Sequence, residues 1–194
     1  MLLSKLSWFD MSRLASLMLF GRRKEAIKIL APHMEAMGLV GLAENSLQVC
    51  TKEVKQVFDV LADEQNWPVL IHCTQGKDRT GLLVMLILFL LGVDVEAVDE
   101  DYRVSEPELA PEKEDRMKEI SSIGLSEQFA VCPPDLVPSV HTLLQEEYSS
   151  AEAYLRGIGV SSDTVDFIKR KLLVDASQVE AVQPDGFQGS SLQA

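Results

Sequence analysis

Ten consecutive residues, His72 to Gly81, combine side chains that could carry out covalent chemistry on an anion. Cys73 is a candidate nucleophile, and Arg79 presents a rigid fork that can grip two phosphate oxygens and cannot lose its charge. Positive surroundings lower the pKa of a thiol from about 8.5 to roughly 3.5–7.5, so we expect Cys73 to be a thiolate at neutral pH. A thiolate attacks phosphorus and forms a covalent intermediate. Thr80 could donate its hydroxyl to the sulfur and help to hold the charge.

The apolar runs on either side of these residues predict how they are held. The short run before them predicts a buried strand over Val69–His72, and the longer run after them predicts a buried helix over residues 80–91. A helix N-terminus carries unpaired N–H groups and partial positive charge, which suit an anion. Gly76 and Gly81 let the backbone turn tightly and approach a ligand closely. The sequence therefore predicts a phosphate-binding loop between a strand and a helix.

The string resembles the cysteine-dependent phosphatase signature, in which His-Cys is followed by five residues, Arg, and Ser or Thr. Its Gly-Lys-Asp-Arg-Thr-Gly ending is similar to that of the bacterial and fungal tyrosine/serine phosphatases related to the secreted mycobacterial phosphatase. The resemblance implies hydrolysis of a phosphomonoester through a phosphocysteine, and we expect neither a cofactor nor a metal. It implies the following site: catalytic Cys73, Asp78 and Arg79; phosphate-binding Thr74, Gln75, Gly76, Lys77, Asp78 and Arg79; supporting His72, Thr80 and Gly81.

The general acid that protonates the leaving oxygen is a separate question. Many cysteine phosphatases carry an Asp for this purpose on a loop well before the cysteine, and the corresponding region here offers only Glu35 and Glu44. Asp78 lies beside Arg79, and myotubularin-type lipid phosphatases also have an Asp just before the Arg, where it is thought to be the acid. We therefore assign the acid to Asp78. The alternative is that Asp78 only orients Arg79.

The substrate class stays open between protein and lipid. The leading hypothesis is a phosphatase of phosphoproteins, chiefly of phosphotyrosine and with phosphoserine or phosphothreonine as further substrates. Lys77 would place a second cation beside the phosphate, which favours a phosphoinositide substrate, unless it is simply a solvated lysine. A third hypothesis is a truncated pseudo-phosphatase that binds phosphate without turnover.

The composition excludes several classes of protein. The chain has 194 residues, 46% of them hydrophobic, which predicts one domain with a real core. A formal net charge of −12 disfavours nucleic acid as a partner. Three cysteines, an odd number, indicate a reducing compartment without a disulfide framework, so we expect a cytoplasmic protein with Cys50 and Cys132 buried. The run Leu82–Leu91 is too short to cross a bilayer, and we expect no membrane span.

The rest of the sequence predicts mostly helices. The first thirty residues hold six basic and two acidic residues among apolar ones at helical spacing, which predicts helices that cover the domain, or alternatively a mitochondrial transit peptide. Further helices are predicted over residues 32–38, 51–64, 94–105, 112–122, 136–148, 150–156 and 161–174, with a loop over residues 41–46. We expect a phosphatase domain over residues 1–175 and a disordered tail over residues 176–194.

The fold that the family implies is α/β, a parallel sheet with helices on both faces. The sequence offers one confident strand, Val69–His72, and no good strand before it. Parallel strands need neighbours to satisfy their backbone groups. We therefore expect a protein-tyrosine-phosphatase-like fold that is mostly helical as given and lacks the N-terminal strands of the sheet. The hypothesis is that the sequence is N-terminally truncated and only marginally stable.

Overall fold

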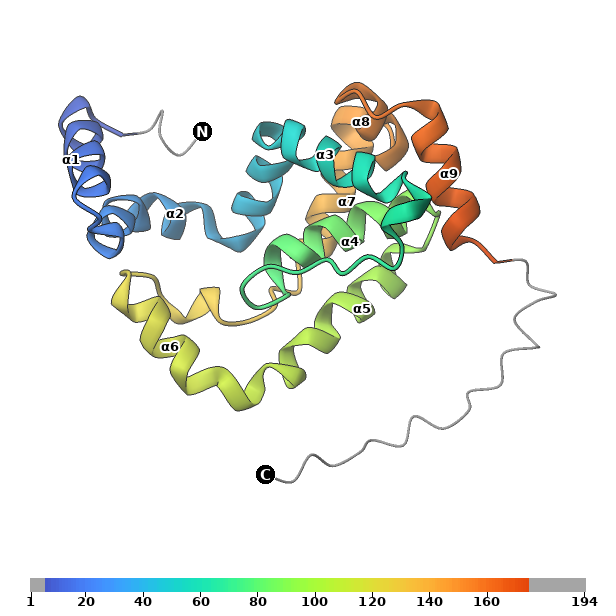
Figure 1. Ribbon diagram of the computed structural model, residues 1–194. Helices are drawn as coiled ribbons and strands as arrows, with labels where there is room; N and C mark the ends of the chain where they lie inside the picture. The colour runs from blue at the N-terminus through green and yellow to red at the C-terminus, as the bar shows by residue number, and fades with distance from the viewer. Residues whose placement is uncertain (1–5, 175–194) are drawn as a thin grey trace.

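The computed structural model describes residues 6–174, and all regular secondary structure in that range is helical (Figure 1). The α-helices there are α1 (Trp8–Leu19), α2 (Arg23–Val49), α3 (Thr51–Leu61), α4 (Asp78–Leu90), α5 (Val95–Glu108), α6 (Lys113–Ser122), α7 (Leu136–Tyr148), α8 (Ala151–Gly157) and α9 (Ser162–Leu172). Three short 3-10 helices lie between them: η2 (Glu64–Asn66), η3 (Ala110–Glu112) and η4 (Glu127–Phe129). The expectation of a mostly helical chain is confirmed for the described residues.

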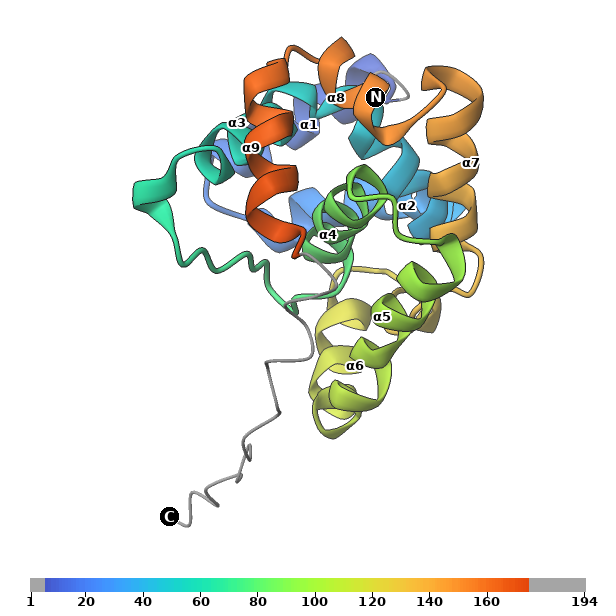
Figure 2. The same ribbon diagram turned by 90° about the vertical axis from the view of Figure 1, so that its right-hand side faces the viewer.

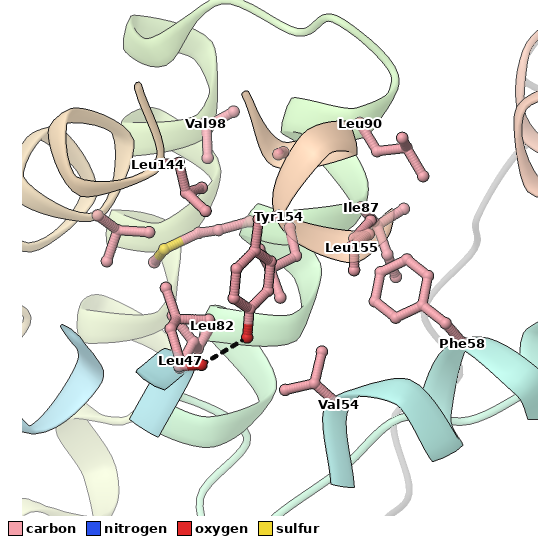
Figure 3. Close-up of a cluster of buried hydrophobic side chains, with 14 of the residues drawn as sticks. Leu47, Val54, Phe58, Leu82, Ile87, Leu90, Val98, Leu144, Tyr154 and Leu155 are labelled. Carbon is pink, nitrogen blue, oxygen red and sulfur yellow. Dashed lines mark hydrogen bonds between the residues drawn. The ribbon is translucent and has the colours of Figure 1, made fainter. Parts of the chain in front are cut away.

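Helix α4 lies at the centre of the fold because it is apolar almost all round, a composition typical of a buried helix. It packs against α2, α5 and α8, and α7 covers α2, α5 and α8 in turn. Its buried side chains are Leu82, Met85, Leu86, Ile87 and Leu90. They meet apolar side chains from α3, α7 and α8 in the main hydrophobic core (Figure 3). This core fixes the start of α4, where the candidate site lies.

A buried tyrosine joins distant parts of the main core. The Tyr154 hydroxyl donates a hydrogen bond of 2.7 Å to the Leu47 carbonyl oxygen (Figure 3). The bond connects α8 to the last turns of α2, which lie 107 residues apart in the chain. The Tyr148 ring packs edge-on against the Tyr154 ring, with 5.0 Å between the ring centroids. The packing thus places one polar group in the core and satisfies it there.

Helices α5 and α6 form an arm that projects from this body (Figure 2). A second, smaller core lies at the junction of the arm with α2; its buried members are Ala31, Ile120, Leu125, Phe129 and Ala130. The Glu35 carboxylate accepts hydrogen bonds from the Ser126 N–H and hydroxyl and from the Gln128 side-chain amide. These bonds hold the Ser126 amide against the Glu35 carboxylate and lower the pKa of Glu35 below its ordinary value, although burial acts against them. The arm is therefore joined to the body by both apolar and polar contacts.

The predicted strand over Val69–His72 is wrong. The segment is extended but is assigned to no strand, and residues 6–174 contain no other strand with which it could pair. Val69 and Ile71 pack against the main core, whereas the intervening Leu70 is 83% exposed. The side chains of this segment thus alternate between the core and solvent as in a strand. A strand forms, however, only where a neighbouring strand pairs with its backbone N–H and C=O groups.

Two other expectations also differ from the structure. The loop predicted over residues 41–46 is helical, because α2 continues to Val49, although Gly38 interrupts its backbone with φ 63° and ψ −177°. Cys50 is exposed, whereas Cys132 is buried as predicted. The predicted disordered tail, residues 176–194, lies outside the described residues.

Helix α2 also bears on the expectation that the chain has no membrane span. By length and composition alone it could cross a bilayer. The break at Gly38 divides it, and Ala31 and Leu47 on either side are buried against the body of the protein. We interpret α2 as a packing helix for these reasons.

Candidate active site

The candidate loop runs directly into the N-terminus of α4. The helix begins at Asp78, and its first backbone hydrogen bond runs from the Gly81 N–H to the Lys77 carbonyl oxygen, at 2.8 Å. Gly76 turns the chain with φ 72°, a left-handed conformation that favours glycine. The Arg79 guanidinium then donates a hydrogen bond of 3.0 Å to the Thr74 hydroxyl. Arg79 therefore reaches back across the loop, where a bound phosphate would need it.

The sulfur of Cys73 lies where several donors converge. Partial burial raises the pKa of the Cys73 thiol, but hydrogen bonds from the Thr80 hydroxyl and from the N–H groups of Thr80, Gln75 and Gly76 outweigh it and lower that pKa to about 6. Thr80 Oγ1 is buried and has no hydrogen-bond partner of ordinary geometry within residues 6–174, so its proton is free to turn toward the sulfur. Cys73 is accordingly a thiolate at neutral pH, as its sequence context predicts.

Gly81 lies in the first turn of α4 and is required there by a close neighbour. A Cβ atom at this position would lie 3.1 Å from Cδ2 of Tyr102, closer than ordinary carbon contacts. Tyr102 is buried, and its ring packs against the first turn of α4. Since Gly81 allows α5 to approach the first turn of α4, it is a packing requirement of the site. Tyr102 belongs to this packing and does not line an open cleft.

Lys77 does not extend toward the phosphate position. Its side chain is fully buried, and its ammonium group donates to Asp78 Oδ1 at 2.5 Å and to the Val131 carbonyl oxygen at 2.9 Å. The expectation of a second cation beside the phosphate therefore has no support in this geometry, and neither does the alternative of a solvated lysine. The ammonium group fastens the loop to the segment after η4. Sequence reasoning missed Val131 as its partner, because a contact across 54 residues leaves no local signal.

Asp78 and Arg79 lie at the edge of a groove of about 300 Å³ beside the loop. The Asp78 side chain is 38% exposed, and Lys77 holds its Oδ1. The groove is lined mainly by apolar residues of α2, α4, η4 and α7, namely Met34, Leu39, Leu42, Ala43, Leu82, Phe129 and Leu136, together with Ser46. A group attached to a phosphate in the loop would find this apolar surface next to the two charged side chains. No sequence motif pointed to the groove, since its walls come from four elements.

The other residues considered for the site, His72 and Glu35, do not line this groove. His72 is exposed, and its Nδ1 lies 3.1 Å from the Cys73 carbonyl oxygen. Glu35, one of the two upstream acids considered, is engaged with Ser126 and Gln128 and does not line the groove. Within the described part of the chain, no three His, Cys, Asp or Glu side chains gather into a group that could hold a metal ion.

A thiolate at a helix N-terminus, with an arginine fork from the first turn reaching across the same loop, defines the class of cysteine-dependent phosphatases. Comparison with known proteins gives the family within that class. Residues 20–174 match the model of the Tyrosine phosphatase family, and the chain belongs to this family.

Individual relatives cover part of the chain. A tyrosine-protein phosphatase of Nostoc commune is 32% identical over 129 residues, which make up 62% of this chain and 44% of that protein. The triple specificity protein phosphatase PtpB of Mycobacterium tuberculosis is 32% identical over 125 residues, 55% of this chain and 44% of that protein. The inositol diphosphatase DSP2 of Arabidopsis thaliana is 33% identical over 61 residues, 31% of this chain and 24% of that protein. The chain thus spans less than half the length of these relatives.

Proposed function

We propose that the protein hydrolyses phosphotyrosine in proteins, with phosphoserine and phosphothreonine as further substrates, through a phosphocysteine intermediate on Cys73. The observation that carries the proposal is one loop that holds both the Cys73 thiol, whose pKa its hydrogen bonds lower to about 6, and the Arg79 guanidinium, which reaches back to Thr74. A low thiol pKa supplies the nucleophile at neutral pH, and the planar guanidinium matches two oxygens of a phosphate. The apolar groove at Asp78 and Arg79 offers contact area for a phenyl ring attached to that phosphate.

The reaction has two chemical steps. In the first, the Cys73 thiolate attacks phosphorus, the bond to the substrate oxygen breaks, and that oxygen takes a proton from Asp78. In the second, Asp78 accepts a proton from water as the water oxygen attacks phosphorus, which releases inorganic phosphate and restores the thiolate. Arg79 and the loop N–H groups stabilise the negative charge on the transferring group in both steps. This scheme needs neither a metal nor a cofactor.

Substitution of Asp78 is the sharpest test of the scheme. If Asp78 is the acid, Asp78→Asn slows hydrolysis of phosphoserine, whose leaving group is poor, by roughly 10²–10⁴-fold. Hydrolysis of nitrophenyl phosphate, whose leaving group needs little protonation, falls much less. Asp115→Asn, on an exposed aspartate of α6, is the matched control and leaves both rates unchanged. Equal losses on the two substrates would instead assign Asp78 the role of orienting Arg79.

A second candidate is an inositol phosphate or phosphoinositide as substrate. The name of the Arabidopsis relative favours it, since that protein is called an inositol diphosphatase. Lys77 does not support this candidate, because its ammonium group is buried and already paired and so does not supply a second cation beside the phosphate. Side-by-side assays with a phosphotyrosine peptide, a phosphoserine peptide, a phosphatidylinositol phosphate and an inositol diphosphate distinguish the candidates. The proposal expects the highest kcat/KM on phosphotyrosine.

The same assays address the third hypothesis, a protein that binds phosphate without turnover. Inorganic phosphate should raise the melting temperature under either hypothesis, because the loop binds the anion. Turnover distinguishes the two. Phosphate-dependent stabilisation with no hydrolysis of any substrate in the panel would favour the pseudo-phosphatase.

A further inference from the structure

Helix α1 exposes several large apolar side chains, which is unusual for a surface helix. Its apolar side chains Trp8, Phe9 and Leu19 are 88%, 71% and 83% exposed, and none of its residues is buried. In the described residues α1 packs chiefly along α2, and it stands at the end of the molecule opposite α9 (Figure 1). Exposed apolar surface of this kind on one element marks an interaction site.

One exposed stripe of α1 carries no charge. Trp8, Ser12, Ala15 and Leu19 follow one another at spacings of three or four residues, so they share one stripe of the helix, and all four are exposed. Leu14 and Leu17, which are half-buried, lie on the opposite side, toward α2. The helix therefore has one apolar side packed on the protein and a second that nothing in the described chain covers.

The charge around this face indicates what could cover it. Residues 6–30 carry five basic and two acidic side chains, a net charge of +3 in a chain whose total is −12. Three of the basic residues, Arg22, Arg23 and Lys24, are consecutive, exposed, and directly follow α1. A large apolar face beside a basic cluster is the pattern of a helix that lies in the headgroup region of an anionic membrane.

We propose that α1 and the basic cluster Arg22–Lys24 form a peripheral docking surface for anionic lipid bilayers. Trp8, Phe9 and Leu19 enter the interface, and the basic cluster contacts the lipid phosphates. At 1.5 Å per residue the helix is about 18 Å long, too short to cross a hydrocarbon core of about 30 Å, so it lies in the plane of the surface. The strongly acidic remainder is repelled from the same surface, which orients the molecule with α1 toward it.

A second copy of the chain is the competing occupant, and the charges disfavour it. Packing one α1 face against another would cover the apolar side chains but supply no opposite charge for Arg23 and Lys24, since the neighbouring acid, Glu25, is already paired with Arg22. Lipid supplies both the apolar layer and the opposite charge.

Co-sedimentation with phospholipid vesicles tests the proposal without reference to catalysis. The protein should bind phosphatidylcholine vesicles that contain phosphatidylserine, bind vesicles of phosphatidylcholine alone far more weakly, and be released by high salt. Trp67→Phe leaves Trp8 as the sole tryptophan of the chain, and its emission should shift to the blue on binding. Equal binding to both kinds of vesicle, no binding to either, or retention after high salt, as for an inserted span, would overturn it.

Matched substitutions locate the surface. Leu19→Glu should weaken binding at least 10-fold, because it places a charge in the apolar layer, whereas Leu70→Glu, at a leucine that is also 83% exposed, should have no effect. Neutralising Arg23 and Lys24 to Gln should weaken binding roughly 30-fold. Neutralising the similar pair Arg170 and Lys171 at the end of α9 should change it little. The proposal fails if either control weakens binding as much as its partner, or if Leu19→Glu abolishes a dimer in the absence of lipid.

Discussion

Cys73 is the residue on which the proposed chemistry depends, and its neighbours set its charge. Burial alone would favour the neutral thiol, as it does at the buried Cys132, where it raises the pKa. At Cys73 the donors of Thr80, Gln75 and Gly76 converge on the sulfur and reverse this effect. The difference between the two cysteines is therefore a matter of hydrogen bonding at a helix N-terminus.

The pKa of the Cys73 thiol can be measured directly from alkylation kinetics. The rate at which iodoacetamide modifies Cys73 should rise with pH to a plateau, with a midpoint near pH 6, because the thiolate is the reactive form. Thr80→Val should move the midpoint upward, since it removes the hydroxyl that stabilises the thiolate. Inorganic phosphate should slow the reaction at Cys73 but leave that of the exposed Cys50 unchanged. A midpoint that stays in place in the valine variant would exclude Thr80 as a source of the low pKa.

These residues could be assigned as candidates from the sequence because they lie close together in the chain. Cys73, Arg79 and Thr80 lie within eight positions, so the strand-like entry, the glycine turn and the helix start place them without help from the rest of the fold. The direction of Lys77 could not be predicted in the same way. Its partner Val131 comes from a distant segment, and only the packing of the arm brings that carbonyl oxygen to the loop.

Lys77 connects the loop to the segment that follows η4. The ammonium group links the first residue of α4 to the segment between η4 and α7. A fully buried ammonium is stable only when it is paired, and here its partners are the Asp78 carboxylate and the Val131 carbonyl oxygen. This arrangement makes Lys77 part of the support of the site.

Replacing Lys77 by Met tests the link. The variant keeps the length of the side chain but leaves the Val131 oxygen and the Asp78 carboxylate without their donor, so it should lower the free energy of unfolding by roughly 1–3 kcal/mol in urea denaturation. Lys118→Met, at an exposed lysine of α6, is the control and should change it by less than about 0.5 kcal/mol. Equal stability of the two variants would mean that the Lys77 hydrogen bonds do not stabilise the contact between the loop and the segment after η4.

At the scale of elements, the segment Val69–His72 shows what could and could not be predicted from the sequence. The alternation of Val69 and Ile71 inward with Leu70 outward agrees with the expected period of a strand. Pairing depends on a second segment, and residues 6–174 supply none. The local conformation could thus be predicted, but the sheet could not.

In the molecule as a whole, the helices could be predicted from their apolar spacing, and their arrangement could not. The family resemblance implied an α/β fold with a parallel sheet, and the described residues are helical throughout their regular structure. The main core instead closes around α4, with α8 fastened to the end of α2 by the bond from Tyr154 to Leu47 (Figure 3). That bond joins residues too far apart in the chain for any local pattern to indicate it.

Tyr154→Phe should therefore destabilise the whole fold. It leaves the buried Leu47 carbonyl oxygen without its donor and should lower the free energy of unfolding by about 1–2 kcal/mol. Tyr148→Phe keeps the edge-on ring contact and is the natural control, with an expected change below about 0.5 kcal/mol. Urea denaturation of both variants compares them. A neutral Tyr154→Phe would show that water replaces the hydroxyl and that the core is less closed than described.

The most direct test of the central claim is to trap the covalent intermediate. The protein is mixed with a phosphotyrosine peptide carrying labelled phosphate, quenched with detergent at neutral to mildly alkaline pH, digested, and searched by mass spectrometry for a phosphorylated peptide. The account predicts label on Cys73 in the wild-type protein, released by mild acid as a thiophosphate is, and none in Cys73→Ser, because the serine hydroxyl has no comparable thiolate-like form. Turnover without label on Cys73, or turnover that survives in the serine variant, would contradict the account.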